Sequence, residues 1–169
     1  MTVRLFRRPL RALALLAFVV AAPADAVEAG ATAPALSLPG LKVPLSLNDF
    51  KGKVVYLDFW ASWCGPCKKS FPWMNQLQEK YGARGLQVLA VNLDASEDDA
   101  RQFLAKVPAH FAIAFDAQGQ SARQYGVKGM PTSVLIGADG KVLATHTGFT
   151  DAGRAAIEQA LVGALAVRP

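Results

Sequence analysis

Residues 58–69 have the sequence Asp58-Phe59-Trp60-Ala61-Ser62-Trp63-Cys64-Gly65-Pro66-Cys67-Lys68-Lys69, with two cysteines three positions apart at its centre. The apolar run at residues 54–57 before this segment contains two β-branched side chains and predicts a buried strand. After the segment, apolar side chains recur at the spacing of a helix: Phe71, Met74, Leu77 and Tyr81. The cysteines are therefore expected where a strand gives way to a helix.

A cysteine at the start of a helix is predicted to be reactive. The unpaired N–H groups and the positive end of the helix dipole stabilise a thiolate there. Pro66 suits the first turn of a helix, because that position needs no N–H donor. Cys64 is expected to be the more exposed thiol and is predicted to be the nucleophile, whereas Cys67, one turn further in, is predicted to resolve the mixed disulfide.

Other uses of a C-x-x-C pair fit this chain less well. A structural zinc site needs four ligands, but the chain has two cysteines, and its two histidines, His110 and His146, stand far away in the sequence. A structural disulfide across so short a loop would remove little entropy from the unfolded chain. We therefore predict a redox pair, with no metal and no cofactor.

The N-terminus has the pattern of an export signal. Four arginines fall within residues 4–11, an apolar run covers residues 12–22, and Ala24-Asp25-Ala26 forms a small-x-small cleavage site. The run is shorter than the roughly 20 residues that a membrane span needs, so an uncleaved anchor is the alternative. We predict a signal peptide over 1–26, one domain over 27–169, and a periplasmic protein.

Removal of the signal changes the charge of the chain. It takes away four arginines and one aspartate, so that the net charge falls from +5 to +2. The predicted mature chain is therefore only weakly basic, which removes the main argument for a nucleic-acid partner. In an oxidising compartment disulfides persist, so the cysteine pair would act either as a disulfide donor or as a reductant that receives electrons from elsewhere.

Two segments carry a resemblance to a known family. Residues 58–68 resemble the active-site segment of thioredoxin, and Gly129-Met130-Pro131-Thr132, ahead of an apolar strand, is similar to the cis-proline loop of that fold. The export signal, the lead-in at residues 45–53 and the Phe71-Pro72 pair resemble the TlpA/ResA-type periplasmic thioredoxins. The resemblance covers about residues 33–165 and implies an α/β, thioredoxin-like three-layer fold.

The pattern of elements is consistent with that fold. Strands are predicted at residues 36–38, 42–47, 53–59, 86–93, 112–115, 132–136 and 141–147, and helices at 66–81, 96–106, 121–125 and 151–165. This order predicts a mixed central sheet with helices on both faces. The TlpA/ResA-type proteins carry an inserted helix and strand between residues 94 and 126, which is either a packing addition or a wall of the substrate groove.

Asp58 is the third candidate catalytic residue. It lies within an apolar central strand, where a buried carboxylate is costly, so its pKa is predicted to be raised; the alternative is an aspartate that faces solvent at the strand end. The resemblance implies that Asp58 accepts the proton of the resolving cysteine. Two departures qualify this comparison: Ala90 stands where thioredoxin has a partner lysine, and Ser70 stands where many ResA-type proteins have an active-site glutamate.

The remaining candidates form a surface for the substrate. Trp63 is predicted to be a contact residue because it is next to Cys64, and Trp60 is predicted to pack in the core. The resemblance implies that Met130 pairs through its backbone with a substrate strand and that Pro131 forms a wall beside the cysteines. The predicted substrate-binding set is Trp63, Gly65, Pro66, Met130 and Pro131.

These features predict a thiol-disulfide oxidoreductase. Gly65-Pro66 between the cysteines resembles thioredoxin rather than the strong oxidants, which favours a potential nearer −270 than −120 mV. The predicted activity is the reduction of disulfides in exported partner proteins by a monomer that is supplied by a membrane electron donor of the thiol-transfer type. The clients could belong to cytochrome c maturation, copper-centre assembly or general thiol repair, and the motif does not distinguish these.

Three alternatives stay open. The close one is a periplasmic disulfide oxidant or isomerase, which would use the same cysteines. A thiol peroxidase would need Pro-x-x-x-Thr/Ser-x-x-Cys, but Leu57 and Ala61 occupy those positions before Cys64, so antioxidant activity is not expected. A copper-handling protein could use both thiolates, with Met130 nearby, although a cis Pro131 would block the site.

Overall fold

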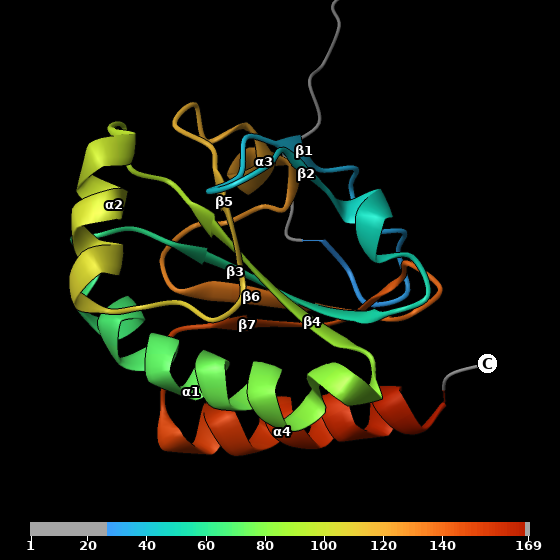
Figure 1. Cartoon of the computed structure of the whole chain (residues 1–169). Coiled ribbons are helices and arrows are strands. Elements are labelled where there is room, and N and C mark those ends of the chain that lie inside the picture. The colour runs from blue at the N-terminus through green and yellow to red at the C-terminus, as the bar shows by residue number, and fades with distance from the viewer. Residues whose placement is uncertain (1–26, 168–169) are drawn as a thin grey trace, which may run out of the picture.

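A five-stranded mixed sheet lies at the centre of the computed structural model, which describes residues 27–167 (Figure 1). The strands are β3 (Val54–Trp60), β4 (Leu86–Asn92), β5 (Ala112–Phe115), β6 (Thr132–Ile136) and β7 (Val142–Thr147). Their order is β5-β4-β3-β6-β7. β3, β4 and β5 are parallel, whereas β6 and β7 each run antiparallel to their neighbours. The predicted mixed sheet is therefore confirmed.

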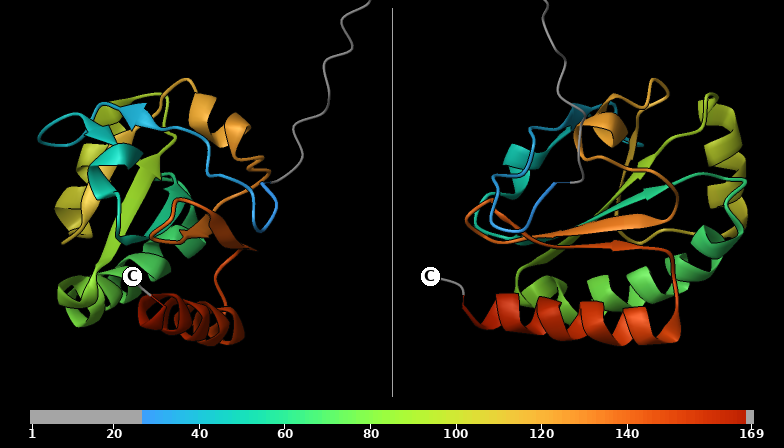
Figure 2. Two further views of the ribbon diagram at one scale, coloured as in Figure 1. Left: turned by 90° about the vertical axis from the view of Figure 1, so that its right-hand side faces the viewer. Right: turned by 180° about the vertical axis from the view of Figure 1, so that it is seen from behind.

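Two layers cover the sheet. The helices α1 (Gly65–Tyr81) and α4 (Asp151–Ala166) lie side by side on one face (Figures 1 and 2). The other face carries the short helix α3 (Gln120–Gln124), the 3-10 helix η1 (Leu47–Phe50) and a two-stranded ribbon of β1 (Ser37–Leu38) and β2 (Leu45–Ser46). A second 3-10 turn, η2 (Gly82–Arg84), links α1 to β4. This is the predicted three-layer, thioredoxin-like arrangement.

The central strand β3 divides the apolar side chains into two cores. All seven of its residues are buried, and successive side chains point to opposite faces. Tyr56 and Trp60 lie in the core beneath α1 and α4, whereas Leu57 and Phe59 lie in the core beneath α3 and the N-terminal segment. A fully buried strand is what the uninterrupted apolar run predicted.

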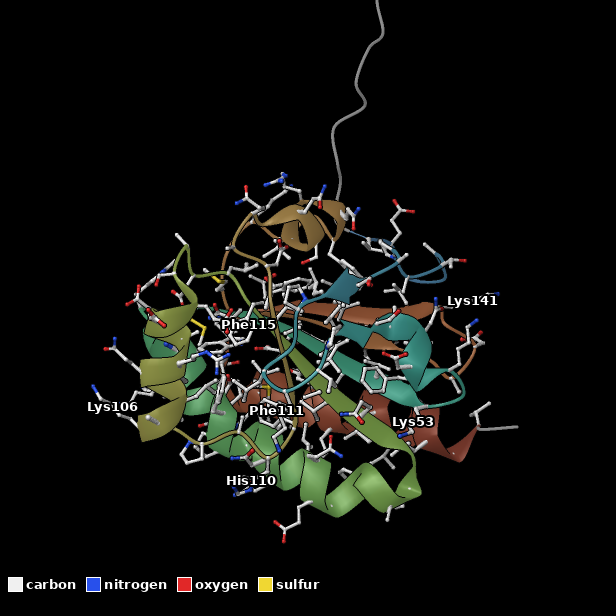
Figure 3. All side chains as sticks on the ribbon, turned by 45° about the horizontal axis from the view of Figure 1, so that its top comes forward. Lys53, Lys106, His110, Phe111, Phe115 and Lys141 are labelled. Carbon is white, nitrogen blue, oxygen red and sulfur yellow. A yellow bond between two sulfur atoms is a disulfide. The ribbon has the colours of Figure 1, made fainter. Side chains whose placement is uncertain are left out.

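The inserted segment packs on the first of these cores. Its helix α2 (Glu97–Lys106) places Phe103 against Trp60 and Phe71, with ring centroids 4.9 and 5.1 Å apart. Phe111 contacts Phe71 at 5.4 Å. In Figure 3 Lys106 projects outward, and Phe111 and Phe115 lie over the body of the protein. The insertion therefore contributes to the core around Trp60.

The N-terminal segment pairs with both edges of the sheet. At β5, the Leu41 N–H donates to the Ile113 carbonyl and the Phe115 N–H donates to the Pro39 carbonyl. At the start of β7, Gly30 donates to Val142 at 2.8 Å. The second predicted strand is wrong in length: residues 42–47 were expected, but only Leu45–Ser46 pairs with β1.

Two smaller details differ from the sequence prediction. α3 begins at Gln120, one residue early, because the Asp116 carboxylate accepts hydrogen bonds from the backbone N–H groups of Gln120 and Ser121 at 3.0 and 2.7 Å. Ser96 is at the N-cap of α2 as expected, but its side chain makes no capping hydrogen bond. The predicted signal peptide lies outside the described residues. Within residues 27–167 no helix has the length and apolarity to cross a membrane.

Candidate active site

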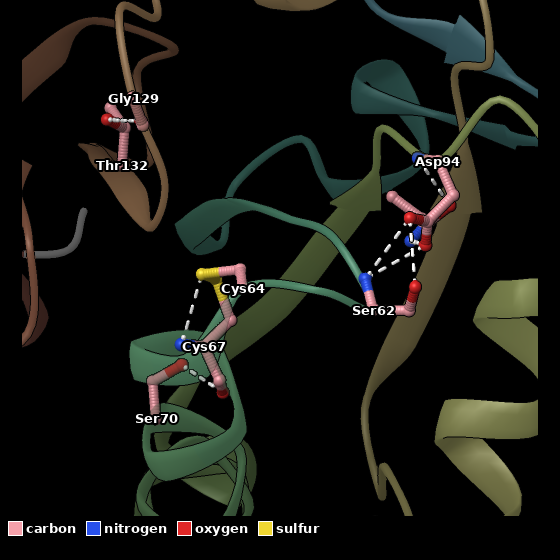
Figure 4. Close-up of a disulfide and its surroundings, with 8 residues drawn as sticks. Ser62, Cys64, Cys67, Ser70, Asp94, Gly129 and Thr132 are labelled. Carbon is pink, nitrogen blue, oxygen red and sulfur yellow. Dashed lines mark hydrogen bonds between the residues drawn. A yellow bond between two sulfur atoms is a disulfide. The ribbon is translucent and has the colours of Figure 1, made fainter.

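The two cysteines lie where β3 ends and α1 begins, as the sequence predicts. Cys64 is the N-cap residue of α1 and is 5% exposed, whereas Cys67 is fully buried. They form a disulfide, with Cα atoms 5.2 Å apart. The Sγ of Cys64 accepts a hydrogen bond from the Cys67 N–H at 3.2 Å (Figure 4). Of the two sulfurs, Cys64 is thus the one that a partner can reach.

An apolar and exposed rim surrounds Cys64. Trp63 is 73% exposed, and Gly65 and Pro66 are exposed on the other side of the cysteine. Trp60, in contrast, is fully buried and packs against Phe71 with ring centroids 4.8 Å apart. A large exposed aromatic ring beside a reactive sulfur offers contact area to a partner protein.

The Met130–Pro131 peptide bond is cis. Strand β6 starts directly after it, and the register pairs Thr132 with Phe59 near the end of β3. Pro131 therefore lies at the end of the sheet where β3 finishes and the chain continues toward Cys64. Pro131 is buried and Met130 is half-buried. The Thr132 hydroxyl donates to the Gly129 carbonyl at 2.6 Å and closes the loop (Figure 4).

Asp58 is buried in the middle of the sheet. It is 1% exposed and stands between Ala90 on β4 and Ser133 on β6. Its Oδ2 has no hydrogen-bond partner among the described residues. Burial raises the pKa of Asp58 well above its usual range, because an ion is poorly solvated there. The alternative of a solvent-facing aspartate is therefore wrong, and a carboxylate with a raised pKa is a stronger base.

Neither of the two departures from the family pattern places a charge in the core. Ala90 is fully buried and offers Asp58 only a methyl group. Ser70 is 1% exposed, and its hydroxyl donates to the Cys67 carbonyl at 2.9 Å. Within residues 27–167 no cluster of three His, Cys, Asp or Glu residues could hold a metal ion. The site is thus a pair of sulfurs with one buried carboxyl group.

A group of polar residues that was not predicted from the sequence supports the loop before Cys64. Asp94, which is 4% exposed, accepts hydrogen bonds from the Ser62 N–H at 2.9 Å, the Ser62 hydroxyl at 3.0 Å and Asn92 Nδ2 at 2.7 Å (Figure 4). Asp94 lies two residues after the end of β4, and Ser62 lies two residues after the end of the parallel strand β3. The carboxyl ends of parallel strands lie at the same end of a sheet. A polar residue shortly after each of two parallel strands was therefore the sequence signal that could have predicted this contact.

We expect an Asp94→Ala protein to lose about 2 kcal/mol of unfolding free energy, because the partly buried Ser62 N–H and hydroxyl and the buried Asn92 amide all lose their hydrogen-bond acceptor. A Ser62→Ala protein keeps that N–H bond and loses only the hydroxyl bond, so it is expected to lose about half as much. Urea unfolding of both variants measures the difference. Equal losses would mean that the backbone bond from Ser62 to Asp94 contributes little.

The inserted helix also borders a groove next to the cysteines. A cavity of about 310 Å³ lies between α1 and α2, with Ser62, Lys68 and Lys106 among its lining residues. Ser62 is two residues before Cys64, so the groove begins beside the exposed rim. The insertion is thus a packing element whose helix also borders this groove, and its role as a wall of the substrate groove stays a prediction.

Comparisons with known proteins agree with this geometry. The family model described as Redoxin matches residues 28–161. The thiol-disulfide oxidoreductase ResA of Bacillus thuringiensis subsp. konkukian (strain 97-27) is 39% identical over 122 residues, which are 70% of this chain and 69% of that protein. ResA of Geobacillus thermodenitrificans (strain NG80-2) is 39% identical over 124 residues, 73% of this chain and 71% of that protein.

A solved structure extends the similarity to three dimensions. A protein of Chlorobium tepidum, described as a thiol:disulfide interchange protein DsbE, has a TM-score of 0.81 and 58% sequence identity, and the match covers 83% of this chain and 99% of that chain. The segment that the family model matches, residues 28–161, includes both cysteines, Asp58 and the Met130–Pro131 loop. The similarity therefore extends over the whole candidate site.

Proposed function

Since this chain belongs to the redoxin family and is a thiol-disulfide oxidoreductase of the ResA/TlpA type, we propose that it acts as a reductase of exported proteins. The observation that carries the proposal is the position of Cys64 at the N-cap of α1, beside the exposed Trp63. A thiolate is stabilised there, and a partner protein can reach it. Cys67, which is fully buried, is suited to an intramolecular step.

In the proposed reaction, the Cys64 thiolate attacks one sulfur of a client disulfide, and the other client sulfur leaves as a thiolate. Cys67 then loses its proton to Asp58 and attacks the Cys64 sulfur. The mixed disulfide breaks, the client leaves with both sulfurs reduced, and Cys64 and Cys67 are joined as the disulfide seen in this structure. A thiol-transfer protein of the membrane would then reduce this disulfide.

Five residues are proposed to bind the client. Trp63, Gly65 and Pro66 form the exposed rim next to Cys64. Met130 would pair through its backbone with an extended client segment, and Pro131 would form the wall behind the attacked disulfide. Main-chain pairing is tolerant of sequence, so this arrangement is suited to several clients rather than to one.

The location and assembly of the protein are part of the proposal. Residues 1–26 would direct export and would be cleaved after Ala26, leaving residues 27–169 as a monomeric thioredoxin-like domain in the periplasm. A retained N-terminal anchor is the alternative, and N-terminal sequencing of the exported protein distinguishes the two. Nucleic acid is not expected as a partner, since the mature chain carries a net charge of only +2.

The direction of electron flow is tested by the reduction potential. We expect a value nearer −270 than −120 mV, because Cys64 Sγ accepts a single hydrogen bond among the described residues and strong oxidants need a more strongly stabilised thiolate. Equilibration with glutathione buffers of known ratio, read from the fraction of reduced protein, measures the potential. A value at the oxidant end would reverse the proposed direction and identify a disulfide donor.

A further inference from the structure

The strand register places three polar residues in one row across the sheet. Asp58 on β3 is paired with Ser133 on β6, and Ser133 is paired with His146 on β7. Directly opposed residues point to the same face, with Cβ atoms about 5 Å apart. Asp58 and His146 are therefore separated by about 10 Å at Cβ, and the Ser133 side chain stands between them.

The row lies on the face that α1 and α4 cover. Leu135 and Ala144, each two residues from the row on β6 and β7, belong to the core beneath these helices, as does Tyr56 on β3. Ser133 is 4% exposed. His146 is half-buried on β7, the last strand of the sheet. The row thus leads from the buried Asp58 to a residue that reaches solvent.

Both ends of the row carry a buried polar atom without a hydrogen-bond partner. These atoms are Oδ2 of Asp58 and Nε2 of His146. Buried polar atoms are nearly always paired, so two unpaired atoms on either side of Ser133 require an explanation. In this structure the Ser133 hydroxyl is instead hydrogen bonded with Tyr56. A carboxyl oxygen, a hydroxyl and an imidazole nitrogen are also the groups that pass protons by exchanging hydrogen bonds.

Asp58 needs such a route, because it is 1% exposed and must lose its proton before it can accept the proton of Cys67. We propose that His146 carries the proton between Asp58 and solvent through the hydroxyl of Ser133. When the Ser133 hydroxyl turns from Tyr56 into the row, the Asp58 carboxyl gives its proton to the Ser133 oxygen while the Ser133 hydroxyl proton moves to His146 Nε2. Because Nε2 is buried, the imidazolium then releases its other ring proton, from Nδ1, to water. This inference rests on the proposed role of Asp58 as proton acceptor.

The shifts at the two ends favour such a transfer. Burial raises the pKa of Asp58 and lowers the pKa of His146. Both shifts favour the uncharged forms, a protonated carboxyl and a neutral imidazole, and these are the forms from which the transfer starts.

The other titratable groups on the surrounding elements are already engaged or exposed. On α4, Glu158 accepts from Lys80 and Tyr81 of α1 at 2.8 and 2.7 Å, and Arg154 pairs with Asp151 and lies over the Phe149 ring. Burial raises the pKa of Tyr56 on β3 above its usual value, the nearby Asp58 adds to the rise, and a hydrogen bond with the Ser133 side chain acts against it. Lys80 is itself exposed, and the other charges on α1, which are also exposed, are Lys68, Lys69 and Glu79. The charges nearest in sequence to β7 are Lys141, which is exposed, and Asp151. Asp151 pairs with Arg154 through one guanidinium NH2 group, whereas Nε of Arg154 is buried without a hydrogen-bond partner among the described residues.

The test separates the two thiol steps in a single turnover. Reduced protein is mixed with a symmetrical aromatic disulfide whose thiol is coloured: Cys64 releases the first equivalent, and Cys67 releases the second. In His146→Phe we expect the second rate at neutral pH to fall at least about 10-fold, with the first rate unchanged. Ser133→Ala is expected to have the same effect, and free imidazole is expected to restore the second rate in His146→Ala.

The controls distinguish proton transfer from structural support. Thr145→Val changes an exposed side chain on the opposite face of β7 and is expected to leave both rates unchanged. His146→Gln can hydrogen bond but cannot titrate in this range, so it is expected to be as slow as His146→Phe. A normal second rate and pH profile in His146→Phe, or in His146→Gln, would overturn the inference. Absence of the first step in the wild-type protein would instead overturn the reductase proposal.

Discussion

A Cys64→Ser protein is expected to reduce insulin at least about 1,000-fold more slowly than the wild-type protein. The hydroxyl of serine is not ionised near neutral pH and cannot attack a disulfide as a thiolate does. The fold should persist, because serine is a favourable N-cap residue and can accept the hydrogen bond that the Cys67 N–H gives to Cys64. Loss of a disulfide across so short a loop should change stability little. Insulin precipitation in the presence of dithiothreitol measures the rate.

The matched variant Cys67→Ser keeps the attacking sulfur and removes the resolving one. It should form mixed disulfides that do not break, so that exported proteins accumulate in covalent adducts. Adducts seen on non-reducing gels and released by a small thiol would identify the clients. The Cys64→Ser protein is the control and should capture nothing. Insulin reduction by Cys64→Ser at the wild-type rate, or equal capture by both variants, would contradict the assignment of Cys64 as nucleophile.

Asp58→Asn is expected to make the protein more stable and much less active. In the folded state the pKa of Asp58 is raised, so between the ordinary carboxyl pKa and this raised value the folded protein binds more protons than the unfolded one. Its stability therefore falls as the pH rises through that interval. Each unit of the shift is worth about 1.4 kcal/mol, and each kcal/mol raises the melting temperature by about 3 °C in a domain of this size.

The gain in melting temperature should depend on pH in a defined way. It should be absent below about pH 3, where Asp58 is protonated in both states, and should grow toward neutral pH. Asp116→Asn is the control. Burial acts to raise the pKa of Asp116, but hydrogen bonds from Ser121, Gln120 and Ala122 outweigh burial and hold it below its usual value. Asp116→Asn should therefore destabilise the protein at neutral pH.

The effect of Asp58→Asn on activity should appear in one thiol step only. Asparagine cannot accept the Cys67 proton, so the second step is expected to slow about 100-fold at neutral pH, whereas attack by Cys64 is unaffected. The coloured-thiol assay separates these steps. If the variant is more stable but its second step is unchanged, then the buried Asp58 destabilises the fold and takes no part in the reaction.

Most of the sheet could be predicted from the sequence, because it rests on local patterns. The bounds of β5 and β6 agree with the prediction at both ends, since each is a short apolar run between turn residues. The change from strand to helix at Cys64 could also be predicted, because a buried strand precedes it and Pro66 and a helical repeat follow it. The burial of Asp58 followed from its apolar neighbours.

The remainder depended on contacts between distant segments. Asp94 and Ser62 are 32 residues apart, and only the parallel register of β3 and β4 brings them together. His146 appeared isolated in the sequence, and its place beside Ser133 depends on the register of β6 and β7, which is shifted between Leu135 and Ile136. The length of β2 depends on its pairing with β1, which involves only Leu45 and Ser46 of the predicted strand. Registers of this kind are not encoded in local periodicity.

The pairing of residues 30–41 with both edges of the sheet has a consequence for biogenesis. An open strand edge offers unpaired N–H and C=O groups and is a template for aggregation. In this chain the protecting segment is the first part of the described domain to be synthesised, but its partner strands β5 and β7 follow about 70 and 110 residues later. A nascent chain therefore contains the segment that protects the sheet edges before the edge strands have been made. Only the completed domain is protected against strand addition by another molecule.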